Sequence, residues 1–281
     1  MKNFKVIAEI GNVHIGSLKR AKKLAYLAKL AGADALKSQK RNPYESVKKK
    51  LWNKPHPKQI FAYGKTYLEH RINVELSINE HKELKEYCEK MEMDYFVSVW
   101  DITSAKKIIK ELKPKFIKIP SPCNNNYKLI NYILDNFEKD IYISTGMTTK
   151  KEREELYKYL LPYKSKIVIF HCTSGYPVPF ENIYLKEISL LKKIFPRVGF
   201  SNHGYGIALE PVSYILGARY FERHFIDDRT FRHSDASASL ESQGLYKLIR
   251  DLKGIQKAFQ YKPDNIIDLE QEQRNKLKIE N

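Results

Sequence analysis

Two histidines end two short apolar runs late in the chain, and their spacing suggests that they act together. His203 follows the run VGFS, and His224 stands near the end of the run YFERHF, with a helix-length segment between them. A strand that returns parallel through a right-handed helix brings both carboxyl ends to the same edge of a sheet. Two neutral imidazoles near Glu222 and Asp235 then suit a borderline divalent cation. In the alternative, one histidine caps a helix and the other belongs to the core.

Polar side chains also stand at the ends of other apolar runs. Lys37 and Lys118 could bind a phosphate or a carboxylate, because lysine supplies the charge and neighbouring hydroxyls donate short hydrogen bonds. Lys118 lies between two isoleucines, so it must point away from any helix layer, and a buried ammonium needs an anion. The same lysines could instead pair with Glu9 and Glu222. The hydroxyl and amide side chains at these ends are Gln39, Ser98, Ser121, Ser144, Ser174 and Ser201.

The order of segments predicts the elements that position these side chains. Eight short runs rich in Ile, Val and Phe take turns with segments of helical periodicity, which is typical of a parallel sheet buried on both faces. Eight strand-then-helix units predict an α/β fold, a single (β/α)8 TIM barrel, whose active site lies at the carboxyl ends of the strands. The predicted strands are residues 5–11, 34–39, 94–99, 115–121, 140–145, 166–173, 197–201 and 220–225.

One domain accounts for most of the chain. We expect residues 1–260 to form the barrel and residues 261–281 to form a polar, partly ordered tail. The long loop after the second strand, residues 40–78, is the one interruption of the pattern. A connection of this length is uncommon inside a compact domain and is usually functional.

Composition argues against several other classes of protein. The chain has 281 residues and a net charge of +17, but its lysines are spread over nearly every predicted helix, which favours solvated faces over a nucleic-acid surface. No apolar segment is long enough for a signal peptide or a membrane span. The three cysteines lack a CxxC pattern, which favours a reducing compartment. We therefore expect a cytoplasmic protein with no membrane or nucleic-acid partner.

Short motifs occur in order along the chain and together are highly specific. They are AEIGNVHIGS (8–17), AGADALKSQKRNP (31–43), FVSVWD (96–101), FIKIPS (116–121), ISTGM (143–147), FHCTSGYPVP (170–179), GFSNHGYG (199–206) and ERHFIDDRTFRHSDASASLES (222–242). This set resembles the sialic acid (nonulosonate) synthases. The chain is most similar to a short subgroup that consists of the barrel alone, without a C-terminal antifreeze-like domain.

The resemblance implies an activity and a role for each matched residue. The implied reaction condenses phosphoenolpyruvate with an aldose, an N-acetylmannosamine-like or related amino sugar, to give a 2-keto-3-deoxy nonulosonic acid and phosphate, and the implied assembly is a homodimer. Glu9, Glu222 and Lys118 would be catalytic, and His203 and His224 would bind Mn²⁺ or Mg²⁺. The implied substrate-binding residues are Lys37, Gln39, Ser98, Ser121, Ser144, Ser174, Tyr176, Ser201 and Asp235.

The residues alone leave other functions open. A related synthase could make a shorter ulosonate or a phosphorylated nonulosonate, and a barrel that has lost catalysis could bind RNA or a polysaccharide. The presence of Glu9, Lys37, Lys118, His203, His224 and Asp235 favours the enzyme.

We also expect the 40–78 loop to close over the sugar, because a reactive cationic intermediate needs protection from water. Arg41, Asn42 and Lys65 of this loop could then donate hydrogen bonds to the sugar. Alternatively, the loop is a solvated, lysine-rich excursion or a dimer contact.

Overall fold

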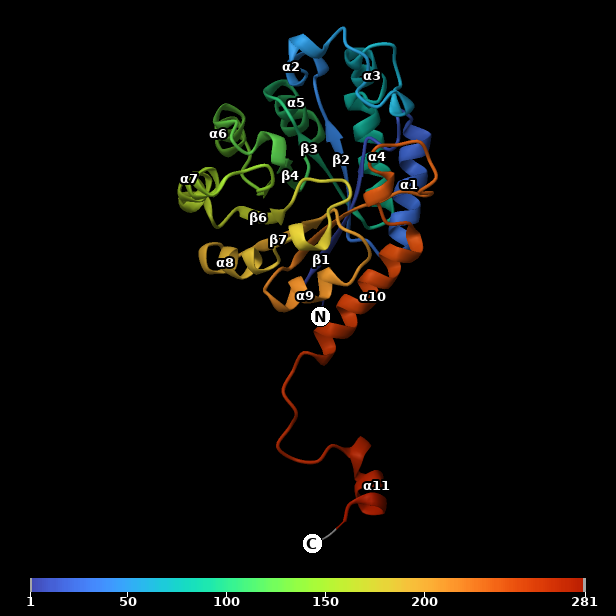
Figure 1. The fold of residues 1–281 in the computed structure, drawn as a ribbon, viewed down its shortest axis with the longest axis vertical. Coiled ribbons are helices and arrows are strands. Elements are labelled where there is room, and N and C mark those ends of the chain that lie inside the picture. The colour runs from blue at the N-terminus through green and yellow to red at the C-terminus, as the bar shows by residue number, and fades with distance from the viewer. Residues whose placement is uncertain (1, 280–281) are drawn as a thin grey trace.

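The computed structural model describes residues 2–279, and its eight strands close into a parallel barrel in sequence order (Figure 1). Pairing of the first strand with the last completes the barrel and sets Glu9 opposite His224. The TIM barrel predicted from the sequence is therefore confirmed. The strands are β1 (Lys5–Gly11), β2 (Ala35–Lys40), β3 (Asp94–Val99), β4 (Phe116–Ile119), β5 (Asp140–Ser144), β6 (Ile167–Cys172), β7 (Val198–Asn202) and β8 (Tyr220–His224).

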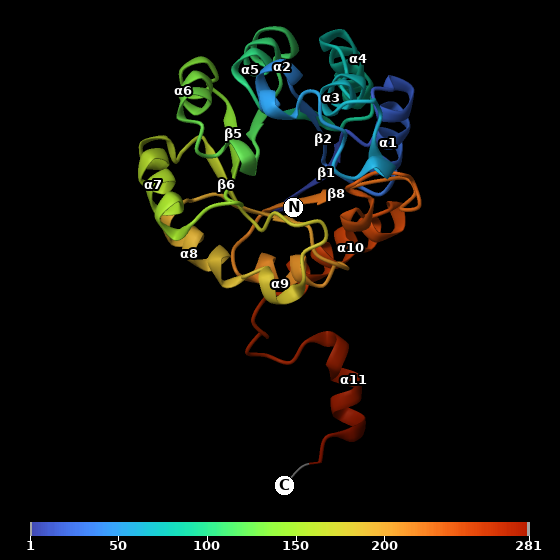
Figure 2. The same ribbon diagram turned by 45° about the horizontal axis from the view of Figure 1, so that its top comes forward.

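Helices surround the strands, as a view toward the mouth of the barrel shows (Figure 2). Several begin at a reciprocal cap, in which a Ser or Thr hydroxyl accepts from a backbone N–H and a Glu three residues later bonds back, as at Ser77 and Thr149. The α-helices between strands are α1 (Leu18–Leu30), α4 (Ile78–Lys90), α5 (Ile102–Lys107), α6 (Tyr127–Asn136), α7 (Lys150–Leu160), α8 (Lys186–Ile194) and α9 (Leu209–Ile215), and α10 (Ser242–Ala258) follows the last strand.

The segment between β2 and α4 is less of an open loop than we predicted. It contains the short helices α2 (Pro43–Ser46) and α3 (Tyr67–Asn73) and two 3₁₀ turns, Lys49–Leu51 and Gln59–Phe61. Helix α3 begins at a cap that Thr66 and Glu69 form reciprocally. The segment therefore has local structure that can hold side chains in place above the barrel.

Strand β4 ends earlier than predicted. It stops at Ile119, and a 3₁₀ turn over Ser121–Cys123 follows. Proline at positions 120 and 122 explains the change, because proline has no N–H to donate to a neighbouring strand. The turn leaves Ser121 at the barrel mouth and not within the sheet.

Two apolar layers support the site from below and outside. The larger one packs the helices against the outer faces of the strands, and the smaller one fills the barrel interior. The interior cluster consists of Ile7, Ala35, Phe96, Tyr142, Val168 and Phe170, with Phe116 and Tyr220 packed against it. The polar groups of the site stand on this floor, and the ammonium of Lys118 lies 4.2 Å from the centroid of the Phe170 ring.

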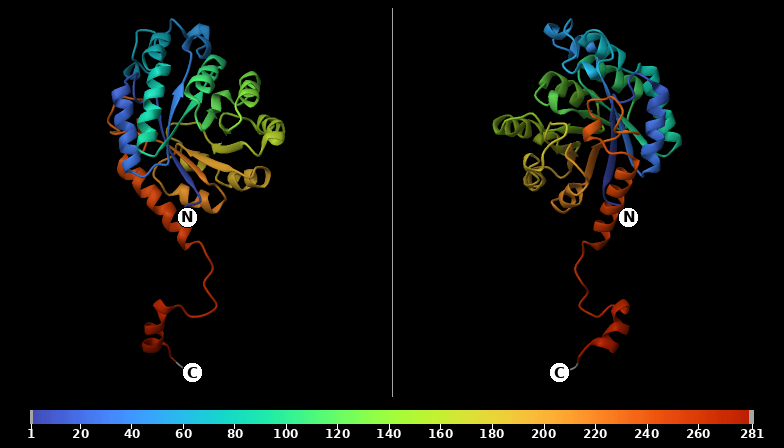
Figure 3. Two further views of the ribbon diagram at one scale, coloured as in Figure 1. Left: turned by 180° about the vertical axis from the view of Figure 1, so that it is seen from behind. Right: turned by 45° about the vertical axis from the view of Figure 1, so that its right-hand side comes forward.

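The end of the described chain leaves the barrel. Helix α10 still packs against the barrel through its buried residues, but a further helix, α11 (Asp268–Leu277), stands clear of the barrel in both views of Figure 3. The predicted tail is polar, as expected, but it includes this helix, none of whose residues is buried. Within residues 2–279, no helix combines the length and apolar character needed to cross a bilayer.

Candidate active site

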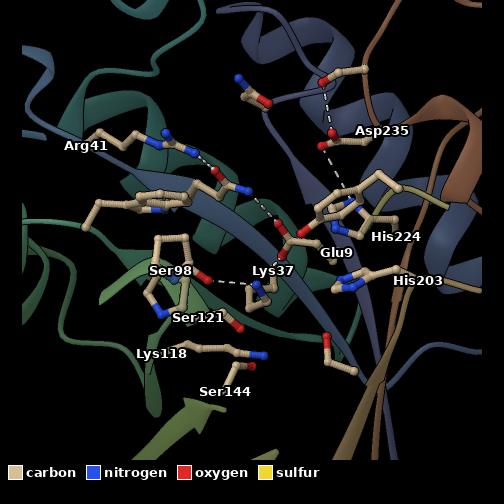
Figure 4. Close-up of a pocket in the computed structure, with 18 of the residues that line it drawn as sticks. Glu9, Lys37, Arg41, Ser98, Lys118, Ser121, Ser144, His203, His224 and Asp235 are labelled. Carbon is tan, nitrogen blue, oxygen red and sulfur yellow. Dashed lines mark hydrogen bonds and ion pairs between the residues drawn. The ribbon is translucent and has the colours of Figure 1, made fainter. Parts of the chain in front are cut away.

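Two lysines and two glutamates form the polar floor of the barrel. Figure 4 shows three of them, Glu9, Lys37 and Lys118. Lys37 on β2 forms an ion pair with Glu9 on β1 and donates a hydrogen bond of 2.7 Å to Ser98 on β3. Lys118 on β4 donates to Glu222 on β8 at 2.7 Å, and Glu222 also lies 3.5 Å from Lys37. All five side chains are buried. The structure thus brings these predicted site residues together, and it also realises the pairing of lysine with glutamate that the sequence left open.

Serine hydroxyls surround this floor. Ser201 donates to Glu222 at 3.1 Å, and Ser98 accepts from Lys37. Ser121 accepts from the backbone N–H of Gly146 at 3.2 Å. A side chain at Gly146 would collide with this hydroxyl and with that of Ser174, so glycine permits a close approach to the backbone here. Hydroxyls and two ammonium groups are what a phosphate or a carboxylate requires.

A cavity of about 220 Å³ opens above the floor. Every predicted site residue except Ser174 lines it, and Ser174 lies in a neighbouring hollow with Thr145 and Thr173. Arg41, which was expected to donate to the sugar, also lines the cavity. The residues that line the cavity and that the sequence analysis did not assign to the site are Asn12, His56, Phe61, His70, Arg71, Trp100, Pro120, Pro122, Met147, Cys172, His233 and Ser234.

Five of the residues that line the cavity, Arg41, His56, Phe61, His70 and Arg71, belong to the segment after β2. Arg41 directly follows β2 and was expected to reach the sugar, whereas the other four do not stand at strand ends, so the barrel rule could not select them. The only signal in the sequence was the density of basic and aromatic residues in 40–78, which does not distinguish one position from another. Lys65 illustrates the difficulty, since it is exposed and does not line the cavity.

The two predicted metal ligands face each other on one side of the cavity. The rings of His203 and His224 have centroids 5.3 Å apart, and the ring of Tyr176 lies 4.5 Å from the first and 5.5 Å from the second. Nδ1 of His203 lies 2.8 Å from the carbonyl oxygen of Thr173. If Nδ1 carries the proton to this acceptor, Nε2 keeps a free lone pair.

The chemistry of these donors fits a divalent cation. Nδ1 of His224 is buried without a hydrogen-bond partner and lies 3.7 Å from Asp235. Burial lowers the pKa of His224 to about 3, so its ring is neutral, as a ligand must be. In residues 2–279, no three His, Cys, Asp or Glu side chains converge on one metal position. A cation at His203 and His224 would therefore take its other ligands from water or substrate.

The thiol of Cys172 is a second possible partner for Nδ1 of His203, besides the carbonyl of Thr173. Its sulfur lies 3.8 Å from Nδ1 of His203. Burial lowers the pKa of His203, but Cys172, Thr173 and Glu222 together outweigh burial, and the net direction is upward. The contact of Nδ1 with the carbonyl oxygen of Thr173 is much shorter, at 2.8 Å, and lies within the usual range for an N–H···O hydrogen bond.

The two buried glutamates differ in their affinity for protons. Burial raises the pKa of Glu9, and Glu222 adds to this while Lys37 opposes it. Burial acts in the same direction on Glu222, but Lys118 and Lys37 outweigh it and hold its pKa at about 2. Carboxyl groups whose pKa values are pushed apart suit different roles in acid–base chemistry. Glu9 is thus the stronger base, and Glu222 is a fixed negative charge.

A buried network outside the barrel positions the loop that carries His203. Arg223 donates to Glu210 at 2.8 Å and to the carbonyls of Gly204 and Gly206 at 3.0 and 2.9 Å. Asn202 donates to the same carboxylate of Glu210 at 2.8 Å and accepts from the N–H of Gly204 at 2.8 Å. The backbone on both sides of the imidazole is therefore fixed by charge-assisted hydrogen bonds.

Comparison with known proteins places this geometry in a family. The profile of the NeuB family matches residues 24–263. The chain belongs to the NeuB family. The match includes β2 to β8, and with them Lys37, Lys118, His203 and His224, whereas Glu9 on β1 precedes it.

Relatives of this NeuB-family chain are named as synthases. It is 33% identical to the N-acetylneuraminate-9-phosphate synthase of Homo sapiens over 255 residues, which cover 90% of this chain and 70% of the human protein. It is 34% identical to the N,N'-diacetyllegionaminic acid synthase of Campylobacter jejuni, with 92% and 78% of the two chains covered. The crystal structure of a sialic acid synthetase from Leptospira borgpetersenii aligns with a TM-score of 0.79 at 27% identity, covering 98% of this chain and 92% of that one.

Proposed function

We propose that this protein joins phosphoenolpyruvate to the open-chain aldehyde of an N-acetylmannosamine-like aldose and releases phosphate and a 2-keto-3-deoxy nonulosonic acid. One observation carries the proposal. Two buried lysines and a set of serine hydroxyls converge at the barrel mouth beside two facing imidazoles. The names of the related synthases support the same class of reaction.

The floor of the barrel suits phosphoenolpyruvate. Its phosphate and carboxylate need positive charge and hydrogen-bond donors, which Lys37, Lys118 and the serine hydroxyls provide. Both ammonium groups already lie against carboxylates. Neither lysine is therefore an isolated charge in the interior before an anion binds. The glycine at 146 lets the hydroxyls of Ser121 and Ser174 lie close to the backbone at the edge of this site.

His203 and His224 would hold the divalent cation, Mn²⁺ or Mg²⁺. When bound there, the cation would supply Lewis-acid polarisation of the aldehyde carbonyl. Tyr176 packs beside both rings and limits the space around the reacting carbon.

The buried glutamates complete the reaction. C3 of phosphoenolpyruvate forms the new C–C bond to the aldehyde carbon, whose oxygen gains a proton, and positive charge develops at C2. Water then adds to C2, Glu9 accepts a proton from it because its pKa is raised, and the C–O bond to phosphate breaks as the keto group forms. Glu222 stays ionised and stabilises the charge at C2.

A condensation assay tests the proposal. Purified protein is given phosphoenolpyruvate, Mn²⁺ and one member of a panel of aldoses, and both released phosphate and product mass are measured. We expect phosphate release that depends on the aldose, with a product mass equal to aldose plus phosphoenolpyruvate plus water minus phosphoric acid. Failure of every aldose, with phosphoenolpyruvate left intact, would refute the proposed activity.

A further inference from the structure

Two arginines of the segment after β2 line the cavity without a carboxylate partner. Arg41 donates to the side-chain oxygen of Gln39 at 2.7 Å and stacks on Trp100, with its guanidinium carbon 3.3 Å from the ring centroid. Arg71 donates to the hydroxyl of Tyr67 at 3.3 and 3.2 Å. A guanidinium has five N–H groups. Across residues 2–279, neither arginine forms an ion pair with a carboxylate.

The acidic groups nearby are already engaged. The carboxylate of Glu75 accepts from Lys40 at 2.9 Å and from the backbone N–H of Arg41 at 3.0 Å. Glu9 is paired with Lys37. Asp235 lies 3.7 Å from the ring of His224 and 3.9 Å from that of His233.

The two positive charges also act on each other. The pKa of Arg41 is lowered to about 9, first by burial and then by Arg71. Holding two like charges together at a cavity wall is unfavourable unless an anion joins them. Guanidinium groups bind phosphate and carboxylate in a bidentate manner, which makes arginine the usual residue for such anions.

The position of this pair fits the far end of a sugar. Figure 4 shows Arg41 on the opposite side of the cavity from His203 and His224, with Glu9 between them. An aldose whose aldehyde carbon lies at the two imidazoles would therefore extend its last carbon toward the arginines. The arginines are not needed for the phosphate of phosphoenolpyruvate, because we assign that phosphate to Lys37 and Lys118 on the floor of the barrel.

We propose that Arg41 and Arg71 form an anion subsite, and that the acceptor is an aldose with a phosphate ester on the carbon farthest from its aldehyde. This inference rests on the proposed function, since it assumes that the aldehyde reacts beside His203 and His224. It narrows that function from aldoses in general to phosphorylated ones.

Paired acceptors and matched variants test the subsite. The assay compares N-acetylmannosamine with its 6-phosphate, in the presence of phosphoenolpyruvate and Mn²⁺, and gives kcat/KM for each acceptor. We expect the kcat/KM of the wild type to be at least about tenfold higher for the phosphate ester, because the free energy of a hydrogen bond to a charged group corresponds to a ratio of this size. Arg71→Gln should lower kcat/KM for the phosphate ester about 10- to 100-fold, chiefly through KM, and leave the unphosphorylated sugar within about twofold.

Arg71 decides the test because, among the described residues, its side chain donates hydrogen bonds only to Tyr67. Arg41→Gln should act in the same direction, although it also frees the side chain of Gln39. Arg71→Lys keeps the charge and should retain part of the preference. Lys65→Gln is the control, because it removes one positive charge from the same segment at an exposed position that does not line the cavity.

Two different failures can be told apart. If both acceptors react equally well in the wild type, or if Arg71→Gln lowers both equally, the anion subsite is refuted while the condensation stands. If neither acceptor reacts and phosphoenolpyruvate stays intact, the proposed function fails, and the inference fails with it.

Discussion

Lys118 and Glu222 form a hydrogen-bonded ion pair of 2.7 Å across the interior of the barrel. The two residues come from β4 and β8, which lie on opposite sides of the closed sheet. Both are buried, and Glu222 is also 3.5 Å from Lys37. The carboxylate of Glu222 therefore lies close to two buried ammonium groups, of which Lys37 is also paired with Glu9. This relationship leads to the first two predictions.

Glu222→Gln should destabilise the protein strongly. Removing one member of a buried ion pair leaves an uncompensated charge and typically costs about 3–5 kcal/mol of unfolding free energy. The double variant with Lys118→Met should recover much of the loss, because it removes the unpaired ammonium as well. Denaturant unfolding of the wild type, Glu222→Gln, Lys118→Met and the double variant measures these free energies of unfolding. Glu111→Gln is the control, since its pair with Lys82 is partly exposed and should be worth less than about 1 kcal/mol.

The stabilising effect of Glu222 should also depend on pH. The pKa of Glu222 is held at about 2 in the folded state and has an ordinary value of 4.5. A depressed pKa contributes stability above the ordinary value, and this contribution disappears as the pH falls from 4.5 to about 2. The difference in Tm between wild type and Glu222→Gln should therefore shrink over that interval. A constant difference would show that the charge of Glu222 does not stabilise the fold.

Lys118→Met should fold but bind phosphoenolpyruvate poorly. The substitution keeps much of the side-chain volume and removes the charge that we assign to the substrate's anionic groups. Calorimetric titration with phosphoenolpyruvate should show affinity lower by about tenfold or more, as expected for a charge-assisted hydrogen bond. Lys115→Met, three residues earlier and exposed, is the matched control and should bind normally. Wild-type affinity in the Lys118 variant would remove this lysine from the substrate site.

The barrel and the residues of its floor could be predicted from the sequence, because a polar side chain buried near the end of a strand has few directions in which it can point. An apolar strand that carries one lysine, as β4 carries Lys118, can place that lysine only inside the barrel, where its partners also stand at strand ends. Ser121 was found in the same way, although prolines ended the strand before it. Arg71 could not be found, because its place depends on how the segment after β2 docks. Helix α11 lacked an apolar stripe to reveal it, since it buries no residue.

His203 and His224 should bind a divalent cation in solution. Calorimetry with Mn²⁺ should detect one site in the wild type and no binding in His203→Ala or His224→Ala, and excess chelator should abolish condensation. His56→Gln is the control, because that ring also lines the cavity but places Nδ1 2.7 Å from the carbonyl of Lys58. Unchanged Mn²⁺ binding in either alanine variant, or full activity in chelator, would contradict the assignment.

Tyr63→Phe should loosen the cover of the cavity. The hydroxyl of Tyr63 donates 2.7 Å to the carbonyl of Arg232, and the guanidinium of Arg232 packs 5.3 Å from the Tyr63 ring. These contacts join the segment after β2 to the loop between β8 and α10, above the cavity that Phe61, His70 and Arg71 line. Losing the hydrogen bond removes about 0.5–1.5 kcal/mol from the closed arrangement, which corresponds to a shift of about 2- to 12-fold.

The expected result separates a cover from a passive surface segment. The KM for the acceptor should rise by a few fold while the KM for phosphoenolpyruvate, which lies on the floor, stays unchanged. Limited proteolysis should cut residues 40–78 faster in the variant, and both substrates together should slow the cut in the wild type. Tyr44→Phe provides the control, because Tyr44 is an exposed tyrosine of the same segment whose ring packs on Trp52 and does not line the cavity. If the two variants matched in acceptor KM and in proteolysis, the contact with Arg232 would have no part in closing the site.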